Sequence, residues 1–148
     1  AMTGMPSRYY RFRQGPVDFF AIDSNDFDGA QAAWLERALL QSKGPWRVVF
    51  GHHPMRSSGQ HGNDPKLDKA LRPLLKKHRV DFYLAGHDHD YERFATAGRP
   101  VEIVSGGGGA YLRKFNATEP GSKVRHMAHH VLLFEVTRDA ALVRAVGK

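Results

Sequence analysis

Two short stretches of this chain share one pattern, in which an apolar run ends in a glycine that is followed at once by a histidine. The first is Val49-Phe50-Gly51-His52 and the second is Leu84-Ala85-Gly86-His87. Each apolar run predicts a buried strand, and Gly86 predicts a tight turn that a side chain would hinder. Because ligands bind at the carboxyl ends of strands in open α/β sheets, both histidines are predicted to lie at a ligand site.

The second turn carries two histidines, His87 and His89, within the sequence GHDHDYER at 86–93. Neutral imidazole is a common ligand for zinc, iron and manganese. Two strand-glycine-histidine elements separated by a predicted crossover helix therefore favour a metal site. The alternative is a set of exposed loop histidines in a histidine-rich chain, which has 9 histidines in 148 residues.

Together, Gly51-His52-His53-Pro54 and the segment 86–93 resemble the last two motifs of the calcineurin-like metallophosphoesterases. The resemblance is strongest to the purple acid phosphatase branch, particularly its small tartrate-resistant type. It extends to the predicted strand at 17–23, the helix around Trp34 and the loop around His61. It implies an α/β fold: the C-terminal half of an αββα sandwich, with a mixed sheet, flanking helices and a closing β-hairpin.

The same resemblance implies hydrolysis of phosphate monoesters by a two-metal mechanism. By its motifs, His52 and His87 bind one metal and His89 binds the other, the metals being divalent or trivalent iron, zinc or manganese. His61 and His53 are the expected catalytic residues, which face the phosphate ester, stabilise its charge and protonate the departing oxygen. The alternative for both is a loop histidine without a catalytic role.

The family's first three motifs, which supply the aspartate that bridges the metals, have no counterpart here. The chain contains no Gly-Asp dipeptide and no Gly-Asn-His tripeptide. We therefore expect an incomplete site with weak activity, completed by a missing N-terminal half or by a homodimer mate. The alternative is a non-catalytic metal- or anion-binding module, or a subunit completed by a partner chain.

Composition excludes several other classes. The absence of cysteine excludes disulfides, thiolate ligands and a cysteine nucleophile. A net charge of +7 favours anionic partners, but the basic residues are scattered, so nucleic-acid binding is not predicted. No apolar run approaches the roughly 18 residues of a membrane span, and residues 1–6 do not resemble a signal peptide. A membrane partner is therefore not predicted, and the compartment stays open.

The whole chain, 1–148, is expected to be a single unit without internal repeats. Helices are predicted at 30–41, with Asp28 as the N-cap, and at 66–78, where Pro73 predicts a kink or a later start. The four glycines at 106–109 are expected to serve close backbone packing rather than to cradle phosphate. Residues 111–124 are predicted to be irregular, the histidines at 126–130 to lie on an ordinary strand edge, and 131–136 with 141–146 to form the closing hairpin.

Overall fold

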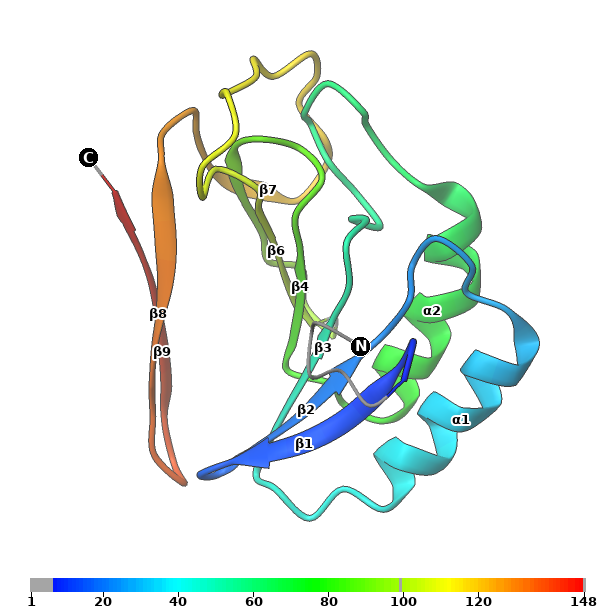
Figure 1. Cartoon of the computed structure of the whole chain (residues 1–148). Coiled ribbons are helices and arrows are strands. Elements are labelled where there is room, and N and C mark those ends of the chain that lie inside the picture. Colours follow the sequence, from blue (N-terminus) through cyan, green and yellow to red (C-terminus); the bar gives the residue numbers. More distant parts are fainter. Residues whose placement is uncertain (1–6, 99, 148) are drawn as a thin grey trace.

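The mixed sheet, flanking helices and closing hairpin expected from the sequence are all present in the computed structural model, which describes residues 7–98 and 100–147. Figure 1 shows both helices on one side of the large sheet and the hairpin on the other side. The large sheet has seven strands, in the order β1 (Tyr10–Gln14), β2 (Val17–Ala21), β3 (Trp46–Phe50), β4 (Phe82–Ala85), β6 (Val101–Ser105), β5 (Tyr91–Phe94) and β7 (Ser122–His126).

The centre of the sheet is parallel, because β2, β3, β4 and β6 run in one direction, whereas β1, β5 and β7 are antiparallel to their neighbours. Helix α1 (Gly29–Leu40) connects β2 to β3, and α2 (Pro65–Lys77) connects β3 to β4. Parallel crossovers are right-handed in nearly all sheets. Since both crossovers step in the same direction along the sheet, both helices cover the same face (Figure 1).

The helix boundaries follow their capping residues. Asp28 caps α1 as predicted, and its carboxylate accepts from the Gln31 amide at 2.7 Å. Asp64 caps α2 in the same way, with Pro65 in the first turn, so the expected later start of this helix is wrong. Helix α2 runs on through Pro73 because its leucines, buried at four-residue spacing, pack on the sheet and offset the lost backbone hydrogen bond.

The hydrophobic core fills the space between the two helices and the sheet. Helix α2 contributes Leu67, Leu71 and Leu75, and α1 contributes Leu35, Ala38 and Leu39. The sheet meets them with Phe20, Val49 and Tyr83, which are at most 1% exposed. This packing fixes β2, β3 and β4 relative to one another, and therefore fixes the loops at their ends. Neither helix in the described part of the chain is long and apolar enough to cross a membrane.

Strand β7 is a correction to the sequence analysis, because residues 122–124 were expected to be irregular. They pair with β5 at the edge of the sheet, with a register shift between Arg93 and Phe94. The strand is largely exposed and rich in charged side chains, so it lacks the apolar alternation by which a strand is recognised. Backbone hydrogen bonds to β5, rather than side-chain burial, define it.

The hairpin of β8 (His130–Val136) and β9 (Ala141–Gly147) forms a separate two-stranded sheet opposite the helices. Its Phe134 ring lies edge-on to Phe82 of β4, at 5.8 Å between centroids. An open cavity of about 530 Å³ lies between the large sheet and β8, and its lining includes Phe19, Phe50, Leu84 and Val131. Val131 is 56% exposed, so this apolar face is open to solvent.

Candidate metal centre

The two glycine-histidine elements lie side by side at the carboxyl ends of adjacent parallel strands. The ladder between β3 and β4 pairs Phe50 with Leu84 and continues beyond the strands. The Gly51 amide donates to the Leu84 carbonyl at 3.1 Å, and the Gly86 amide donates to the His52 carbonyl at 3.0 Å. Backbone pairing therefore brings His52 and His87 together, as the strand pattern predicted.

The two glycines differ in what they contribute. A Cβ on Gly51 would lie 2.9 Å from Ile22 Cγ1, so close packing demands glycine there. A Cβ on Gly86 would meet nothing nearer than 4.0 Å, so the expectation that a side chain would hinder this turn is wrong. The left-handed residue is instead His87, with φ of 66°. Such a conformation is uncommon for a residue other than glycine, and strained residues cluster at functional sites.

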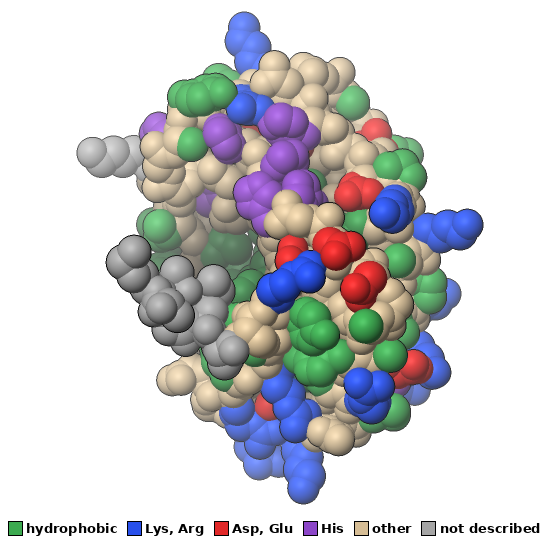
Figure 2. All heavy atoms as spheres, turned by 45° about the vertical axis from the view of Figure 1, so that its right-hand side comes forward, with side chains coloured by type: hydrophobic (Ala, Val, Ile, Leu, Met, Phe, Trp, Pro, Cys, Tyr) green, Lys and Arg blue, Asp and Glu red, His purple; other side chains and the backbone are tan. Residues whose placement is uncertain are grey.

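Four histidine rings gather at this end of the sheet. His87 is central: its ring centroid lies 4.1 Å from that of His61, 4.5 Å from that of His53 and 4.9 Å from that of His52. Figure 2 shows histidine side chains forming a continuous patch on this face. One nitrogen each from His52, His53 and His87 lies within 4.8 Å of the others, which is a donor set suited to a transition metal.

The environment favours the neutral form of two of these rings, His52 and His87. Burial, followed by repulsion from the nearby histidine rings, lowers the pKa of His87 to about 4. Burial likewise lowers the pKa of His52. Neutral imidazoles offer lone pairs, and His52 Nε2 lies 3.0 Å from His87 Nδ1. With metal–nitrogen bonds of about 2.1 Å, two ligands on one tetrahedral zinc lie roughly 3.4 Å apart, close to this separation.

His89 lies outside the group formed by His52, His53 and His87. Its Nδ1 is 2.8 Å from the Tyr111 carbonyl, which can only accept, so Nδ1 donates the hydrogen bond. In a neutral ring the lone pair is then on Nε2. Histidines that bind metals usually donate their second nitrogen to a carbonyl or carboxylate in this way. The hydrogen bond therefore fits the ligand role predicted for His89.

His53 has the opposite arrangement. The Ser24 hydroxyl oxygen accepts from the amides of His52 and His53, at 3.1 and 2.9 Å. Its own hydrogen is left for His53 Nδ1, 3.0 Å away. This hydrogen-bond count places the proton of a neutral His53 on Nε2, so that nitrogen is a donor. A nitrogen that carries a hydrogen can donate to a phosphate oxygen, but it has no lone pair to offer a metal.

His61 reaches the cluster from the loop between β3 and α2, which fits its predicted place facing the substrate. Its amide donates to Asp88 at 2.9 Å, and its ring contacts that of His87. The Arg113 guanidinium lies against His61 Nε2. Because a guanidinium can only donate, His61 Nε2 accepts in this arrangement.

Sequence reasoning missed three acidic residues beneath the histidines, although their alternation in Asp88-His89-Asp90-Tyr91-Glu92 is the signal of one buried face. All three carboxylates are fully buried. Asp88 accepts from the Ser57 hydroxyl at 2.5 Å, and Glu92 accepts from the Ser58 amide at 2.7 Å, so these two acids hold the loop that carries His61. Asp90 has no hydrogen-bond partner within the described ranges, and burial raises the pKa of its carboxyl to about 7.

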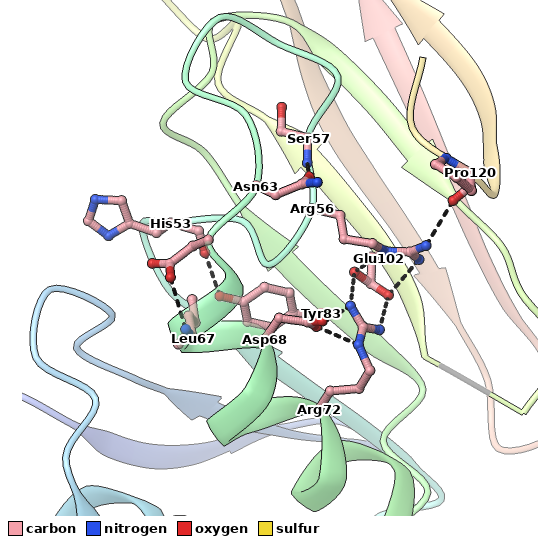
Figure 3. A network of polar contacts seen from close by, with 11 residues as sticks. His53, Arg56, Ser57, Asn63, Leu67, Asp68, Arg72, Tyr83, Glu102 and Pro120 are labelled. Carbon is pink, nitrogen blue, oxygen red and sulfur yellow. Dashed lines mark hydrogen bonds and ion pairs between the residues drawn. The ribbon is translucent and has the colours of Figure 1, made fainter. Parts of the chain in front are cut away.

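A second buried network supports the other side of the same loop (Figure 3). Glu102 of β6 accepts from Arg56 at 2.8 Å and from Arg72 of α2 at 2.6 Å. Tyr83 of β4 donates through its hydroxyl to the His53 carbonyl at 2.6 Å. These contacts fix the backbone at His53 and the start of the loop against the sheet and α2.

Comparison with known proteins agrees with this geometry. A sequence model of the calcineurin-like phosphoesterases matches residues 4–91. Purple acid phosphatase 17 of Arabidopsis thaliana is 36% identical over 110 residues, covering 73% of this chain and 32% of that protein. Tartrate-resistant acid phosphatase type 5 of Sus scrofa is 37% identical over 129 residues, covering 70% of this chain and 38% of that protein.

A solved structure supports the fold. The purple acid phosphatase PPD1 from yellow lupin seeds superposes with a TM-score of 0.86 at 20% identity, covering 94% of this chain and 30% of that one. This chain thus spans about a third of the length of the relatives it matches. The resemblance to purple acid phosphatases found in the sequence is confirmed. The chain belongs to the calcineurin-like phosphoesterase family.

Proposed function

We propose that this chain carries part of the active site of a metal-dependent phosphoesterase that hydrolyses phosphate monoesters. The observation that carries the proposal is the pair of nitrogens His52 Nε2 and His87 Nδ1, 3.0 Å apart at the carboxyl ends of adjacent parallel strands. Membership of the family supports a phosphate ester as the substrate class. The low pKa of His87 supports metal binding at neutral pH.

Each histidine then has a distinct role. His52 and His87 hold one metal, and His89 holds the second through Nε2. Iron, zinc or manganese bound there would polarise the phosphate and lower the pKa of water. His53 donates a hydrogen bond to the phosphate oxygens, and His61 gives a proton to the departing oxygen. The family implies two metals, and the choice among the three elements is part of this proposal.

The site as a whole needs further ligands, so we propose that this chain alone is weakly active. The group of His52, His53 and His87 includes no carboxylate, and Asp88 and Glu92 are engaged by serines. A missing N-terminal half would supply the carboxylates. A homodimer mate is the second source. The open apolar face beside the hairpin supports docking of such a segment, since large exposed apolar patches mark interaction sites.

Metal retention tests the proposal directly. After gel filtration in the presence of zinc or manganese, elemental analysis of the wild-type chain should show about one tightly held metal. His52→Ala and His87→Ala should each weaken metal affinity by more than about 100-fold, since losing even a supporting partner costs about 10–100-fold. His126→Ala is the matched control, because His126 is exposed on β7. Turnover of a phenyl phosphate ester should be slow and should stop when a chelator is added.

Two further variants assign the remaining ligand. His89→Ala should lower uptake of the second, weakly held metal in a titration, whereas His53→Ala should leave metal binding unchanged and should weaken phosphate binding. The opposite result would assign the third ligand to His53. Two tightly held metals per wild-type chain would contradict the incomplete site, and no metal at all would contradict the proposed function.

Self-association tests whether the exposed apolar surface between the large sheet and β8 is an interaction site. We expect the chain to associate as its concentration rises in sedimentation experiments, because Phe12 and Val131 expose apolar surface there, at 45% and 56%. Val131→Ser should reduce this association. Leu40→Ser is the control, because Leu40 is 69% exposed but lies at the end of α1. A chain that stays monomeric at all concentrations would leave the missing half as the source of the ligands.

A specific observation also favours a second candidate function, that of a non-catalytic metal- or anion-binding module or a subunit completed by a partner chain. Among the described residues, the group suited to a metal is made of histidines alone. This module would bind metal and phosphate but would show no turnover after an N-terminal half carrying the upstream motifs is added. Turnover restored by that addition would exclude it.

A further inference from the structure

Arg113 is the guanidinium that the fold places against the histidine cluster. Its side chain lies beside His61 Nε2 and donates to the Tyr111 hydroxyl at 2.7 Å. Its Nε is buried and has no hydrogen-bond partner among residues 7–98 and 100–147. Each terminal nitrogen carries two hydrogens, so one hydrogen on each is left for a phosphate oxygen beside the contacts to His61 and Tyr111.

The backbone holds Arg113 in register with the candidate metal ligands. The Arg113 amide donates to the His89 carbonyl at 3.2 Å, and the Tyr111 carbonyl accepts from His89 Nδ1 at 2.8 Å. The segment 111–113 therefore wraps the turn that carries His89. The guanidinium carbon lies 5.1 Å from the Tyr111 ring centroid, which limits where the side chain can point.

The positive charge of Arg113 suits a phosphate ligand. A phosphate ester carries negative charge, and Arg113 is a cationic side chain that the fold places against the ring of His61. Arginine is always charged, and its planar fork matches the oxygens of a phosphate group. The Arg113 fork is therefore a fixed cation beside the histidine cluster.

We infer that Arg113 is a substrate-positioning residue, which binds a non-bridging phosphate oxygen next to His61 while Tyr111 holds the guanidinium in place. The inference rests on the proposed function, and it adds a residue outside both histidine motifs. It also gives the segment 111–113 a role, because this segment carries the arginine that contacts the phosphate.

The test compares inorganic phosphate binding by the zinc-loaded wild-type chain, Arg113→Met, Arg113→Lys and a control, measured by calorimetry. Arg113→Met should weaken phosphate binding by about 10- to 100-fold, the effect expected for loss of a hydrogen bond to a charged group. Arg113→Lys keeps the charge but loses the fork, so it should recover only part of this loss. Zinc content by elemental analysis should be unchanged in both variants.

Arg125→Met is the matched control. Arg125 likewise packs on an aromatic ring, 5.4 Å from the Phe115 centroid, and it anchors the same irregular segment by donating to the Ala117 carbonyl. It has no contact with the histidine cluster among the interactions of the described chain, so phosphate affinity should stay within about twofold of wild type.

The outcomes separate the two proposals. If wild type holds zinc but does not bind phosphate, the proposed function fails, and this inference fails with it. If wild type binds phosphate and Arg113→Met binds it equally well, only this inference is overturned. If Arg113→Met loses zinc, or if Arg125→Met weakens phosphate binding as much, the residue acts by supporting structure and the inference is likewise overturned.

Discussion

Replacing Glu102 by glutamine is expected to lower the free energy of unfolding by about 3–5 kcal/mol, the usual cost of removing one partner from a buried ion pair. The Glu102 side chain is 3% exposed, and those of Arg56 and Arg72 are each 12% exposed. The neutral amide would leave two guanidinium groups buried around it without their shared carboxylate. Urea unfolding measures the effect, which should shift the midpoint without changing the slope.

The matched control is Glu135→Gln on the hairpin. Glu135 also pairs with an arginine, Arg144, but these side chains are 57% and 52% exposed. Water screens such a pair, so the loss should stay within about 1 kcal/mol. If Glu102→Gln also costs less than about 1 kcal/mol, the buried network does not hold the loop as we describe.

The consequence for the site follows from where Arg56 lies in the chain. It stands three residues after His53 and also donates to the Pro120 carbonyl at 2.9 Å, so it ties the loop after β3 to the segment that carries Tyr111 and Arg113. Glu102 therefore supports the histidines indirectly, through Arg56, without a hydrogen bond to any of them among the described residues. The same variant should weaken metal retention as well as stability, although it removes no ligand.

The sequence predicted the elements that local pattern defines. Strand β3 ends at Phe50 as expected, because the glycine that follows the apolar run marks the end of the strand. The helices were found within one residue, because Asp28 and the leucines of α2 give a cap and a regular period. The neighbouring positions of His52 and His87 also followed, since parallel strands bring their carboxyl ends together.

The parts of the site that the sequence did not predict depend on contacts between residues distant in the chain. Glu102 meets Arg56 and Arg72 from positions 46 and 30 residues away, and no local pattern marks those partners. Arg113 meets His61 across 52 residues for the same reason. The position of the strained residue was also hidden, since glycine in the turn suggested Gly86 whereas the left-handed residue is His87. Side-chain networks and backbone strain therefore had to come from the structure.

The four glycines after β6 were expected to serve close packing, and the structure shows which of them do. A Cβ on Gly106 would lie 2.0 Å from the Asp88 carbonyl oxygen, whereas a Cβ on Gly108 or Gly109 would meet nothing within 4 Å. The Gly106 amide also donates to the Asp90 carbonyl at 3.1 Å. The first glycine is thus pressed against the backbone of the turn that carries His87 and His89.

Gly106→Ala is therefore expected to destabilise the fold by about 3 kcal/mol or more, at the upper end of the range for overpacking, because the obstructing atom is backbone and cannot rotate away. Metal retention should fall with it, since relief of the clash displaces the turn. Gly108→Ala is the control within the same loop: φ is not positive there and the added methyl has open space, so stability should be unchanged or slightly higher. Urea unfolding and elemental analysis of both variants decide the matter. Equal stability of the two variants would show that the turn carrying His87 and His89 moves at little cost. The β3–β4 ladder alone would then position these histidines.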